Sequence, residues 1–432
     1  METLPTPLPL RNFSRFTGPI LDPYRWPFDF NLLPPSSFLV GGSVRDALLG
    51  RQSDHIDLDF VMPEGAVETA RAIATHYKAG FVLLDARRNI ARVVFEDATA
   101  DFAQQVGDSL EVDLWRRDFT VNAIAYNPRT KELYDPLEGY EDLQRGIIRM
   151  ISDRNLKDDP LRLLRAYRQS AQLGFVLEIN TRHHICELAP LLKNIAPERV
   201  HAELSYLLSS DQGTPMLTQA WSDGLLNAWL PKTSTLGVST IQAIDQAFSL
   251  MIRHCSAFES VLKGWVTNQQ QAAGAGRSWL KTTKLACLVS TNDHRAEQQL
   301  WKLKCSRAEV QTVLTILRWL PHLQEYGTLP TTPKEQFFFF RDVEMAFPAV
   351  ILMALALGQN LEVVTQMIQY FLNLDSPIAY PNPLLKGSEL IQTLNLKPGP
   401  AIGQLLEKLC VAHAEGLISN HDEALGYVKK IV

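Results

Sequence analysis

The first part of the chain alternates between two hydrophobic periods. From Phe38 to about Met150, short β-patterned runs (FLVG, IDLDFVM, FVLLD and ARVVFE) are interleaved with helical segments such as AVETARAIATHY. Apolar residues with period two indicate strands, and apolar residues that recur every three or four positions indicate helices. The pattern therefore predicts a mixed α/β domain in this strand-rich part of the chain.

Beyond Asp153 the apolar residues follow the helical period. Glycines and prolines break this region into long helical segments. The clearest of them cover residues 161–173, 197–208, 307–320 and 362–372. The C-terminal two-thirds of the chain is therefore expected to be all-α. Within it, residues 265–278 are expected to form an exposed connection, and the four phenylalanines at 337–340 are expected to lie in a core.

The segment before the first strand has a different character. Residues 1–36 contain many prolines and show no sustained period, which predicts an extended leader with one short helix. The leader also lacks the basic and apolar regions of a signal peptide.

Length and composition narrow the class of protein. The 432 residues exceed one ordinary core, and 46% of them are hydrophobic, so two or more globular domains are expected. No apolar run approaches the roughly 20 residues that span a bilayer, which predicts a cytoplasmic protein without a membrane partner. The five cysteines form no CxxC pair, which argues against zinc. A formal net charge of −5 argues against a strongly basic, indiscriminate nucleic-acid binder.

The sharpest local feature is the sequence GGSVRD at residues 41–46, between an apolar run and a helical segment. Gly41 and Gly42 let the backbone approach a ligand closely, and backbone amides at the start of a helix suit a phosphate chain.

A pair of carboxylates follows within a predicted strand. Asp57 and Asp59 fall in IDLDFV, where the two-residue period puts both side chains on one face of the sheet. Two such carboxylates repel each other, and bound divalent cations would favour both anions. Their oxygen ligands indicate Mg²⁺, with two ions expected during catalysis. Asp101 in TADFA would add a third carboxylate if its strand pairs beside this one; the alternative is an ordinary Asp at a strand end.

Two further motifs carry charge suited to a nucleotide. Arg116 and Arg117 offer planar donor forks for phosphate oxygens, and Asp118 can accept from a ribose hydroxyl.

The second of these motifs, DDPLRLLRAYR, places Arg162, Arg165 and Arg168 on one helical flank with Asp159 at its opening. Asp159 can accept from the exocyclic amine of cytosine or adenine, and Arg162 can donate to ring acceptors. The alternative is a salt-bridged surface stripe capped by an Asp.

Taken in order, GGSVRD, DLD, RRDFTVNA, YDPLEGYEDL, DDPLRLLRAYR and APERVHAEL resemble the motif series of class II tRNA nucleotidyltransferases and the related bacterial poly(A) polymerases. Six motifs in the same order are highly specific. The resemblance is strong over residues 37–208 and general beyond them. It implies a polymerase-β-like head at 37–150, a helical neck at 151–215 that reads the incoming base, and a helical body and tail at 216–432 that grip tRNA.

The resemblance also implies roles for individual residues. Asp57 and Asp59 would bind Mg²⁺, while Gly42 and Arg45 would hold the triphosphate. Arg117 and Asp118 would lie near the ribose.

In the helical neck, Asp159 and Arg162 would pair with the Watson–Crick edge of CTP or ATP, with Arg165 and Arg168 in support. The tRNA 3′-hydroxyl would then attack the α-phosphate and release pyrophosphate. Basic residues of the helical region are expected to hold the tRNA, although a solvated helix face would look the same; the candidates are Lys302, Lys304, Arg307 and Arg318.

Two departures from the family pattern bear on specificity. Asp158 stands where the family usually has Glu, and its shorter side chain is expected to alter fidelity. Enzymes that add the whole CCA carry a long flexible loop between the acidic strand and RRD, whereas residues 102–115 here read only FAQQVGDSLEVDLW. The missing loop favours CC addition, with a separate A-adding enzyme acting afterwards. The alternatives are a complete CCA-adding enzyme, an A-adding enzyme, a poly(A) polymerase and an inactive tRNA-binding protein.

Overall fold

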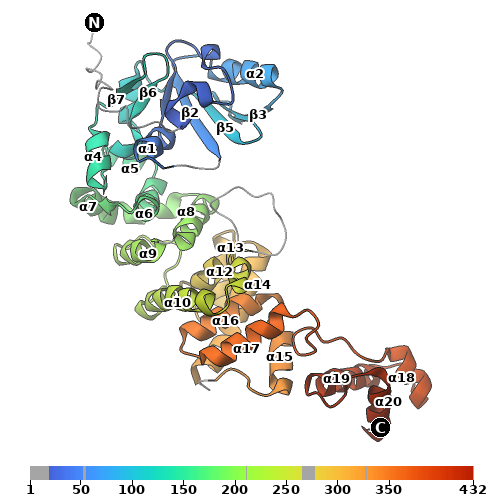
Figure 1. Cartoon of the computed structure of the whole chain (residues 1–432). Coiled ribbons are helices and arrows are strands. Elements are labelled where there is room, and N and C mark those ends of the chain that lie inside the picture. The colour runs from blue at the N-terminus through green and yellow to red at the C-terminus, as the bar shows by residue number, and fades with distance from the viewer. Residues whose placement is uncertain (1–18, 52–54, 211, 265–277, 326–327, 432) are drawn as a thin grey trace. The chain divides into compact units, whose positions relative to one another are not determined.

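The computed structural model describes residues 19–51, 55–210, 212–264, 278–325 and 328–431 (Figure 1). The chain divides into two compact units. The first comprises Met1–Ile195 with Ser222–Leu225, and the second comprises Ala196–Trp221 with Leu226–Val432. The predicted boundaries at 36, 150 and 215 remain predictions.

The first unit contains a seven-stranded mixed sheet, as the alternating pattern predicted. The strand order is β3-β4-β5-β2-β1-β6-β7. Only β2 and β5 pair in parallel, and every other neighbouring pair in this sheet is antiparallel. The strands are β1 Phe38–Val40, β2 Ile56–Met62, β3 Gly80–Asp85, β4 Ile90–Val94, β5 Ala98–Gln104, β6 Ala125–Asn127 and β7 Glu132–Tyr134.

Helices surround this sheet and continue into the predicted neck. The amphipathic run AVETARAIATHY forms α2, which packs against β4 and β5. The predicted helix at 161–173 forms with those same ends, and Gly174 closes it at a φ of 72°, which suits glycine. The helices of this unit are α1 Gly42–Leu48, α2 Ala66–Tyr77, α3 Leu110–Trp115, α4 Gly139–Arg145, α5 Asp153–Asp158, α6 Leu161–Leu173 and α7 Ile179–Leu188.

The leader differs from the prediction of an extended segment. Residues 1–18 lie outside the described residues, but Pro19–Leu21, Pro23–Arg25 and Phe30–Leu32 form three short 3₁₀ helices. Trp26 and Phe28 are buried against Phe60 of β2, and Phe28 also contacts Phe102 of β5. These two aromatic rings make residues 19–36 part of the core of the head, because burying them removes a large apolar area from water.

A second small difference lies beyond Asp153, where only helices were expected. Val176–Leu177 forms a short strand, β9, that pairs in parallel with β8, Ile147–Ile148. The pairing arises because α4 and α6 both end at a glycine with positive φ, and the chain then extends on both sides. Two residues are too few to give a visible period of two.

The second unit is all-helical, as predicted. Phe337, Phe339 and Phe340 are buried, which confirms the predicted core position for three of the four phenylalanines, and Phe338 is half-buried. The predicted connection at 265–278 falls almost entirely outside the described residues. The helices are α8 Pro197–Ser209, α9 Gly213–Ser222, α10 Thr235–His254, α11 Ala257–Lys263, α12 Trp279–Ala286, α13 Asp293–Lys302, α14 Arg307–Glu325, α15 Pro333–Val343, α16 Phe347–Ala356, α17 Leu361–Leu372, α18 Gly387–Leu394, α19 Pro400–Ala414 and α20 His421–Ile431.

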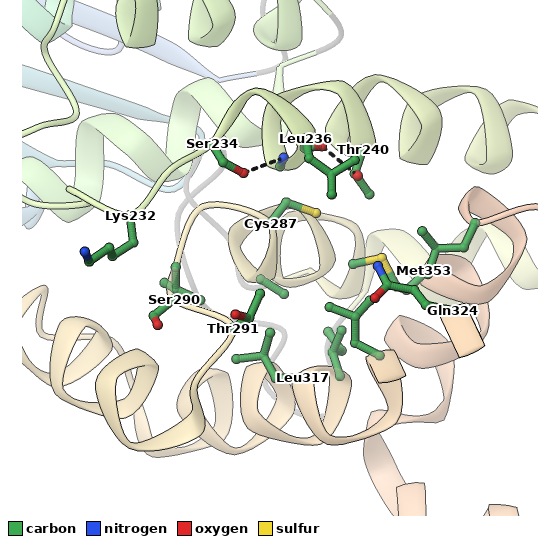
Figure 2. A pocket seen from close by; sticks show the side chains of 16 residues that line it. Lys232, Ser234, Leu236, Thr240, Cys287, Ser290, Thr291, Leu317, Gln324 and Met353 are labelled. Atoms are coloured by element: carbon green, nitrogen blue, oxygen red, sulfur yellow. Dashed lines mark hydrogen bonds between the residues drawn. The ribbon is translucent and has the colours of Figure 1, made fainter. Parts of the chain in front are cut away.

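A cavity of about 350 Å³ lies among α10, α12, α14 and α16 of this unit (Figure 2). Its lining is mainly apolar and includes Leu317 and Met353, and the polar side chains in it are Lys232, Ser234, Thr240, Ser290, Thr291 and Gln324. Burial raises the pKa of the Cys287 thiol in its wall to about 12, so this thiol is protonated at neutral pH. None of the residues predicted to bind nucleotide, metal or RNA lines this cavity.

Candidate functional site

A row of charged residues crosses the sheet at the place where the carboxylate pair was predicted. In the parallel pairing of β2 with β5, Asp59 lies opposite Asp101. In the next pairing Asp101 lies opposite Arg92, which donates from Nε and Nη2 to its two oxygens at 2.6 and 2.8 Å. Asp57, two residues before Asp59 on the same face, accepts from the Thr99 hydroxyl. The predicted juxtaposition of Asp57, Asp59 and Asp101 is therefore confirmed.

The electrostatics of this row suit a cation. Burial and the negative charges of Asp101 and Asp57 raise the pKa of Asp59 to about 6, against the opposing charge of Arg117. A positive ion would relieve this cost, and the oxygen donors match a hard divalent cation. Within the described residues, no three Asp, Glu, His or Cys side chains converge on a ready metal cluster. Arg92 occupies both oxygens of Asp101, so Asp101 would have to release Arg92 to bind metal, whereas Thr99 occupies only one oxygen of Asp57.

The Gly-Gly turn lies directly against the carboxylates. Gly41 has a φ of 76°, and a Cβ at this position would lie 3.4 Å from Arg117 Nη1 and 3.6 Å from Asp59 Oδ2. The added Cβ would make only ordinary contacts, so it is the positive φ that favours glycine here. Ser43, in the first turn of α1, donates to Asp59 Oδ2 at 3.4 Å. The turn therefore lies next to both Asp59, a candidate metal ligand, and Arg117 of the RRD segment.

Arg45 is held by Asp46 and Asn122. It donates to both carboxylate oxygens of Asp46 at 2.9 Å and to Asn122 Oδ1 at 2.7 Å. Its predicted contact with the triphosphate stays a prediction. What the structure adds is that Arg45 ties α1 to the segment that follows RRD.

Arg116 and Arg117 share a carboxylate that the motif analysis did not include. Asp113 of α3 is fully buried and accepts from Arg116 at 2.7 and 2.9 Å and from Arg117 at 3.0 Å. Burial alone would raise the pKa of Asp113, but the charges of Arg117 and Arg116 hold it below its ordinary value. Arg117 Nε is buried without a hydrogen-bond partner among the described residues. A buried donor of this kind is available to an anionic ligand.

Asp118 is buried at the centre of a polar network. Arg165 Nε contacts its Oδ2 at 2.9 Å, and Asn122 Nδ2 donates to its Oδ1 at 2.9 Å. Asn122 also donates to Gln169 Oε1 on α6 at 3.0 Å. Burial would raise the pKa of Asp118, but Arg165 and these hydrogen bonds hold it low. Asp118 is therefore ionised, and its oxygens already accept from the protein.

The two ends of the predicted base-reading motif reach different partners. Arg162 Nη1 donates to the backbone carbonyls of Arg116 and Asn155 at 2.9 and 3.0 Å. Asp159 lies just before α6, where its Oδ1 accepts from Leu161 N at 3.3 Å. Of the three arginines, Arg162 and Arg165 thus contact the RRD segment, whereas Arg168 donates to Gln172 of its own helix at 2.6 Å.

Asp158 is exposed on α5, and its nearest ion pair is with Arg154 at 3.9 Å. No contact between Asp158 and Arg162 is found among the described residues. The expected effect of this shortened side chain on fidelity therefore stays a prediction.

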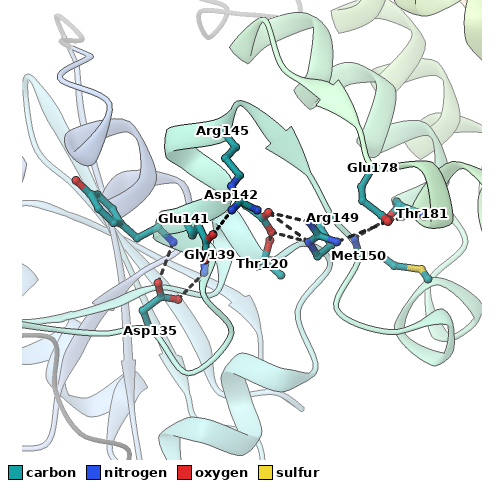
Figure 3. A network of polar contacts seen from close by, with 11 residues as sticks. Thr120, Asp135, Gly139, Glu141, Asp142, Arg145, Arg149, Met150, Glu178 and Thr181 are labelled. Atoms are coloured by element: carbon teal, nitrogen blue, oxygen red, sulfur yellow. Dashed lines mark hydrogen bonds and ion pairs between the residues drawn. The ribbon is translucent and has the colours of Figure 1, made fainter.

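The motif YDPLEGYEDL supports the site through a polar network (Figure 3). Asp135 accepts from the first amides of α4, Gly139 N and Tyr140 N, each at 2.8 Å. Asp142 of the same helix accepts from Thr120 Oγ1 at 2.7 Å, directly after the RRDF sequence.

Asp142 also binds Arg149, which lies 3.6 Å from Glu178, the N-cap of α7. This motif therefore fastens the RRD segment to α4 and α7.

The four candidate RNA-binding residues are exposed in the helical unit. Lys302 Nζ lies 5.0 Å from the ring centroid of Trp229, and Arg318 donates to Leu314 O and Thr315 Oγ1 of its own helix. Arg307 is the first residue of α14, and Lys304 precedes this helix by three residues. Nothing in these contacts distinguishes an RNA-binding face from a solvated one, so the four assignments remain predictions.

Comparison with known proteins decides the family. A model of the poly A polymerase head domain matches residues 37–149, one described as "Probable RNA and SrmB- binding site of polymerase A" matches residues 174–236, and a model of tRNA nucleotidyltransferase domain 2 matches residues 277–428. The CC-adding tRNA nucleotidyltransferase of Synechocystis sp. is 47% identical over 94% of this chain and 96% of that protein. The chain belongs to the class II tRNA nucleotidyltransferase and poly(A) polymerase family. The motif resemblance is thereby confirmed.

Other members of the family have different products in their names. The CC-adding tRNA nucleotidyltransferase of Geobacter sulfurreducens is 30% identical over 91% of each chain. The A-adding tRNA nucleotidyltransferase of Deinococcus radiodurans is also 30% identical, over 92% of this chain and 96% of that one.

Among solved structures, the Thermotoga maritima CCA-adding enzyme complexed with tRNA matches with a TM-score of 0.68 at 21% identity, over 99% of this chain and 97% of that chain. This likeness confirms the predicted fold, an α/β head followed by an all-α region. Within the described residues, no helix of this family member is long and apolar enough to cross a membrane.

Proposed function

We propose that this nucleotidyltransferase adds two cytidines to the 3′ end of tRNA, with CTP as the nucleotide donor. The CC-adding relative from Synechocystis, 47% identical along nearly the whole chain, supports this product. A separate A-adding enzyme would complete the CCA end. We also propose a cytoplasmic location, in keeping with tRNA as the substrate.

The observation that carries CC specificity is the short connection between β5 and α3. β5 ends at Gln104 and α3 begins at Leu110, so only residues 105–109 join them. Gln105 N donates to Met62 O at 2.7 Å, and Val106 N donates to Asp113 Oδ1 at 3.1 Å. The family resemblance places the long flexible loop of complete CCA-adding enzymes at this position. A short, anchored connection cannot perform the movement by which that loop switches the pocket from CTP to ATP.

Two Mg²⁺ ions are the cofactors that the donor set fits. Asp57 and Asp59 would hold them, and Asp101 would join after releasing Arg92. When bound, such ions neutralise phosphate charge and assist deprotonation of the attacking 3′-hydroxyl.

The residues around the carboxylates would position the nucleotide. Arg116 and Arg117 would donate to phosphate oxygens, and Arg117 Nε, which has no hydrogen-bond partner in the described part of the chain, is available for this. The Gly41-Gly42 turn leaves room for the phosphate chain beside Asp59. Asp118, ionised and fixed by Arg165, would face the ribose side of the pocket. Each of these groups is held before substrate arrives, which reduces the reorganisation that the reaction requires.

Base selection would rest on Asp159 and Arg162. Asp159 would accept from the cytosine amine, and Arg162 would donate to the ring acceptors. The hydrogen bonds from Arg162 Nη1 to backbone carbonyls fix its guanidinium next to the RRD segment. The protein would therefore position the group that reads the base, and no template strand would be required.

The test is to size the product at single-nucleotide resolution. Purified protein is given a tRNA transcript that ends at the discriminator base, with Mg²⁺ and CTP, ATP or both. Growth by two residues with CTP, and no third with ATP, is the expected result. Growth by three would make the chain a complete CCA-adding enzyme, and ATP use only on a tRNA ending in CC would make it an A-adding enzyme. A long A tract would make it a poly(A) polymerase, and binding without growth an inactive tRNA-binding protein.

Variants of the carboxylate row complete this test. Asp57→Asn and Asp59→Asn keep side-chain size but remove the charge. Each should lower turnover by at least about 10³-fold while leaving tRNA affinity mostly intact. Asp97→Asn, an exposed Asp in the turn before β5, is the matched control and should keep normal turnover. Near-normal activity of either Asp57→Asn or Asp59→Asn would exclude the proposed site.

A further inference from the structure

Helix α3 lies on the same face of the sheet as the catalytic carboxylates. Strand residues alternate between faces, so Asp57, Asp59 and Val61 of β2 share one face. Leu110 and Leu114 of α3 form a core cluster with Val61. α3 therefore covers this face two residues beyond Asp59.

The opposite side of α3 presents an apolar surface to solvent. Val112 and Trp115, three residues apart on one flank of the helix, are 49% and 48% exposed. Their neighbours on the inner flank, Asp113 and Leu114, are buried. A tryptophan that leaves half of its surface exposed retains a large apolar area in water that a ligand can contact.

The backbone of Trp115 is fixed next to the groups that are proposed to hold the nucleotide. Asn155 Nδ2 donates to Trp115 O at 2.7 Å. The next residue, Arg116, contributes its carbonyl to Arg162 and its guanidinium to Asp113. The exposed Trp115 therefore directly precedes the arginine pair that is proposed to bind phosphate, and Asn155 Nδ2 holds its carbonyl together with that of Arg117, each at 2.7 Å. Aromatic rings beside basic groups are the arrangement that binds unpaired nucleotides.

We propose that Trp115, flanked by Val112, is a stacking platform for the unpaired 3′-terminal base of the tRNA. The proposal rests on the tRNA substrate of the proposed function. The terminal base is the discriminator before the first addition and a cytosine before the second, so its partner must tolerate different bases. Stacking has this property because every base has a π face, whereas a hydrogen-bonding side chain would select one base.

The incoming CTP is a poorer fit for the same ring. Its base already has proposed partners in Asp159 and Arg162, which read a hydrogen-bonding edge. Trp115 presents its exposed surface on the outer flank of α3, away from the Leu114 side that packs on the sheet. A substrate that enters from solvent as a single strand can reach this flank.

The test compares Trp115→Ala and Trp115→Phe with Trp301→Ala, an exposed tryptophan of α13 in the helical unit. Loss of one base stack should raise KM for tRNA by about 10-fold in Trp115→Ala, while Trp115→Phe stays within about 3-fold of wild type. KM for CTP should change little. A tRNA with 2-aminopurine at its 3′ end provides a direct readout, because stacking on the ring quenches its fluorescence. Wild type and Trp115→Phe should quench, and Trp115→Ala should not.

The outcomes separate the two proposals. If wild type adds no cytidine, the proposed function fails, whatever Trp115 does. If wild type is active and Trp115→Ala keeps its tRNA KM and its quenching, the platform is excluded. A rise in KM for CTP instead of tRNA would assign the ring to the incoming nucleotide and would also overturn the proposal. Trp115→Gln, which is polar at an exposed position, replaces the Ala variant if that one folds poorly.

Discussion

Asp113 determines the placement of the arginine pair, and its removal should have a cost that depends on pH. Asp113→Asn leaves Arg116 and Arg117 without their shared anion, and breaking a buried ion pair costs roughly 3 kcal/mol of unfolding free energy. The native pKa of Asp113 is below its ordinary value, so its contribution is fully present above about pH 5 and is lost as pH falls through the native pKa. The difference between wild type and variant should therefore shrink on acidification.

Urea unfolding of both proteins between pH 7 and pH 3.5 measures this difference. Asp153→Asn, which breaks the exposed Asp153–Lys157 pair on α5, serves as the control and should change stability little at any pH. A constant gap between wild type and Asp113→Asn across the pH range would mean that the carboxylate is not stabilised by the arginines. Turnover of the variant should also fall, with KM for CTP rising more than KM for tRNA.

Sequence reasoning found the residues whose geometry depends on local periodicity and missed those set by pairing across the chain. The common face of Asp57 and Asp59 follows from a strand period of two. Arg92 could not be found in this way, because its contact with Asp101 depends on the β4–β5 register. Asp113 carried a usable signal, since a helical Asp followed by Arg at three and four residues predicts the ion pairs that form.

At the scale of elements, α4 depends on a glycine for space and not for backbone freedom. A Cβ on Gly139 would lie 2.2 Å from Thr120 O and 3.1 Å from Ile124 Cγ1. Gly139→Ala should therefore push α4 away from the RRD segment and cost roughly 2–3 kcal/mol of unfolding free energy. Gly403→Ala in α19, where nothing lies within 4 Å of the added Cβ, should instead stabilise by about 0.5–1 kcal/mol. Thermal unfolding of the two variants checks both signs; an unchanged melting temperature for Gly139→Ala would contradict the close approach.

Helices and strands were predictable where one amphipathic pattern continues through the whole element. α6 spans the predicted residues because a single apolar stripe covers its length and a glycine ends it. The leader gave no period, yet Trp26 and Phe28 place it in the core of the head. Two isolated aromatic residues create no pattern, so their burial depends on the aromatic pair Phe60 and Phe102 that other strands supply.

At the scale of the whole molecule, the chain connects its two compact units more than once. Ser222–Leu225 belongs with the first unit, although α9, apart from its last residue Ser222, belongs with the second. Asp223 in this short segment binds Arg182 at 2.7 Å and accepts from Tyr167 at 2.5 Å. The sequence shows one change from an α/β pattern to a helical pattern, and that change cannot reveal that a later segment of the chain packs with the first unit again. The candidate chemistry nevertheless falls within one unit, and the candidate RNA-binding residues fall within the other.

Binding of tRNA therefore tests whether the helical unit contributes to affinity. The quadruple alanine variant of Lys302, Lys304, Arg307 and Arg318 should weaken tRNA binding and flatten the plot of log K against log [salt] by about one for each phosphate that the variant no longer neutralises. Alanine substitution of Arg87 and Arg88, exposed in the β3–β4 turn of the head, is the comparison. Filter binding at several salt concentrations gives both slopes. If the quadruple variant keeps the wild-type slope, its residues lie on a solvated face; if the slope falls in the head variant instead, the tRNA phosphates bind to the head.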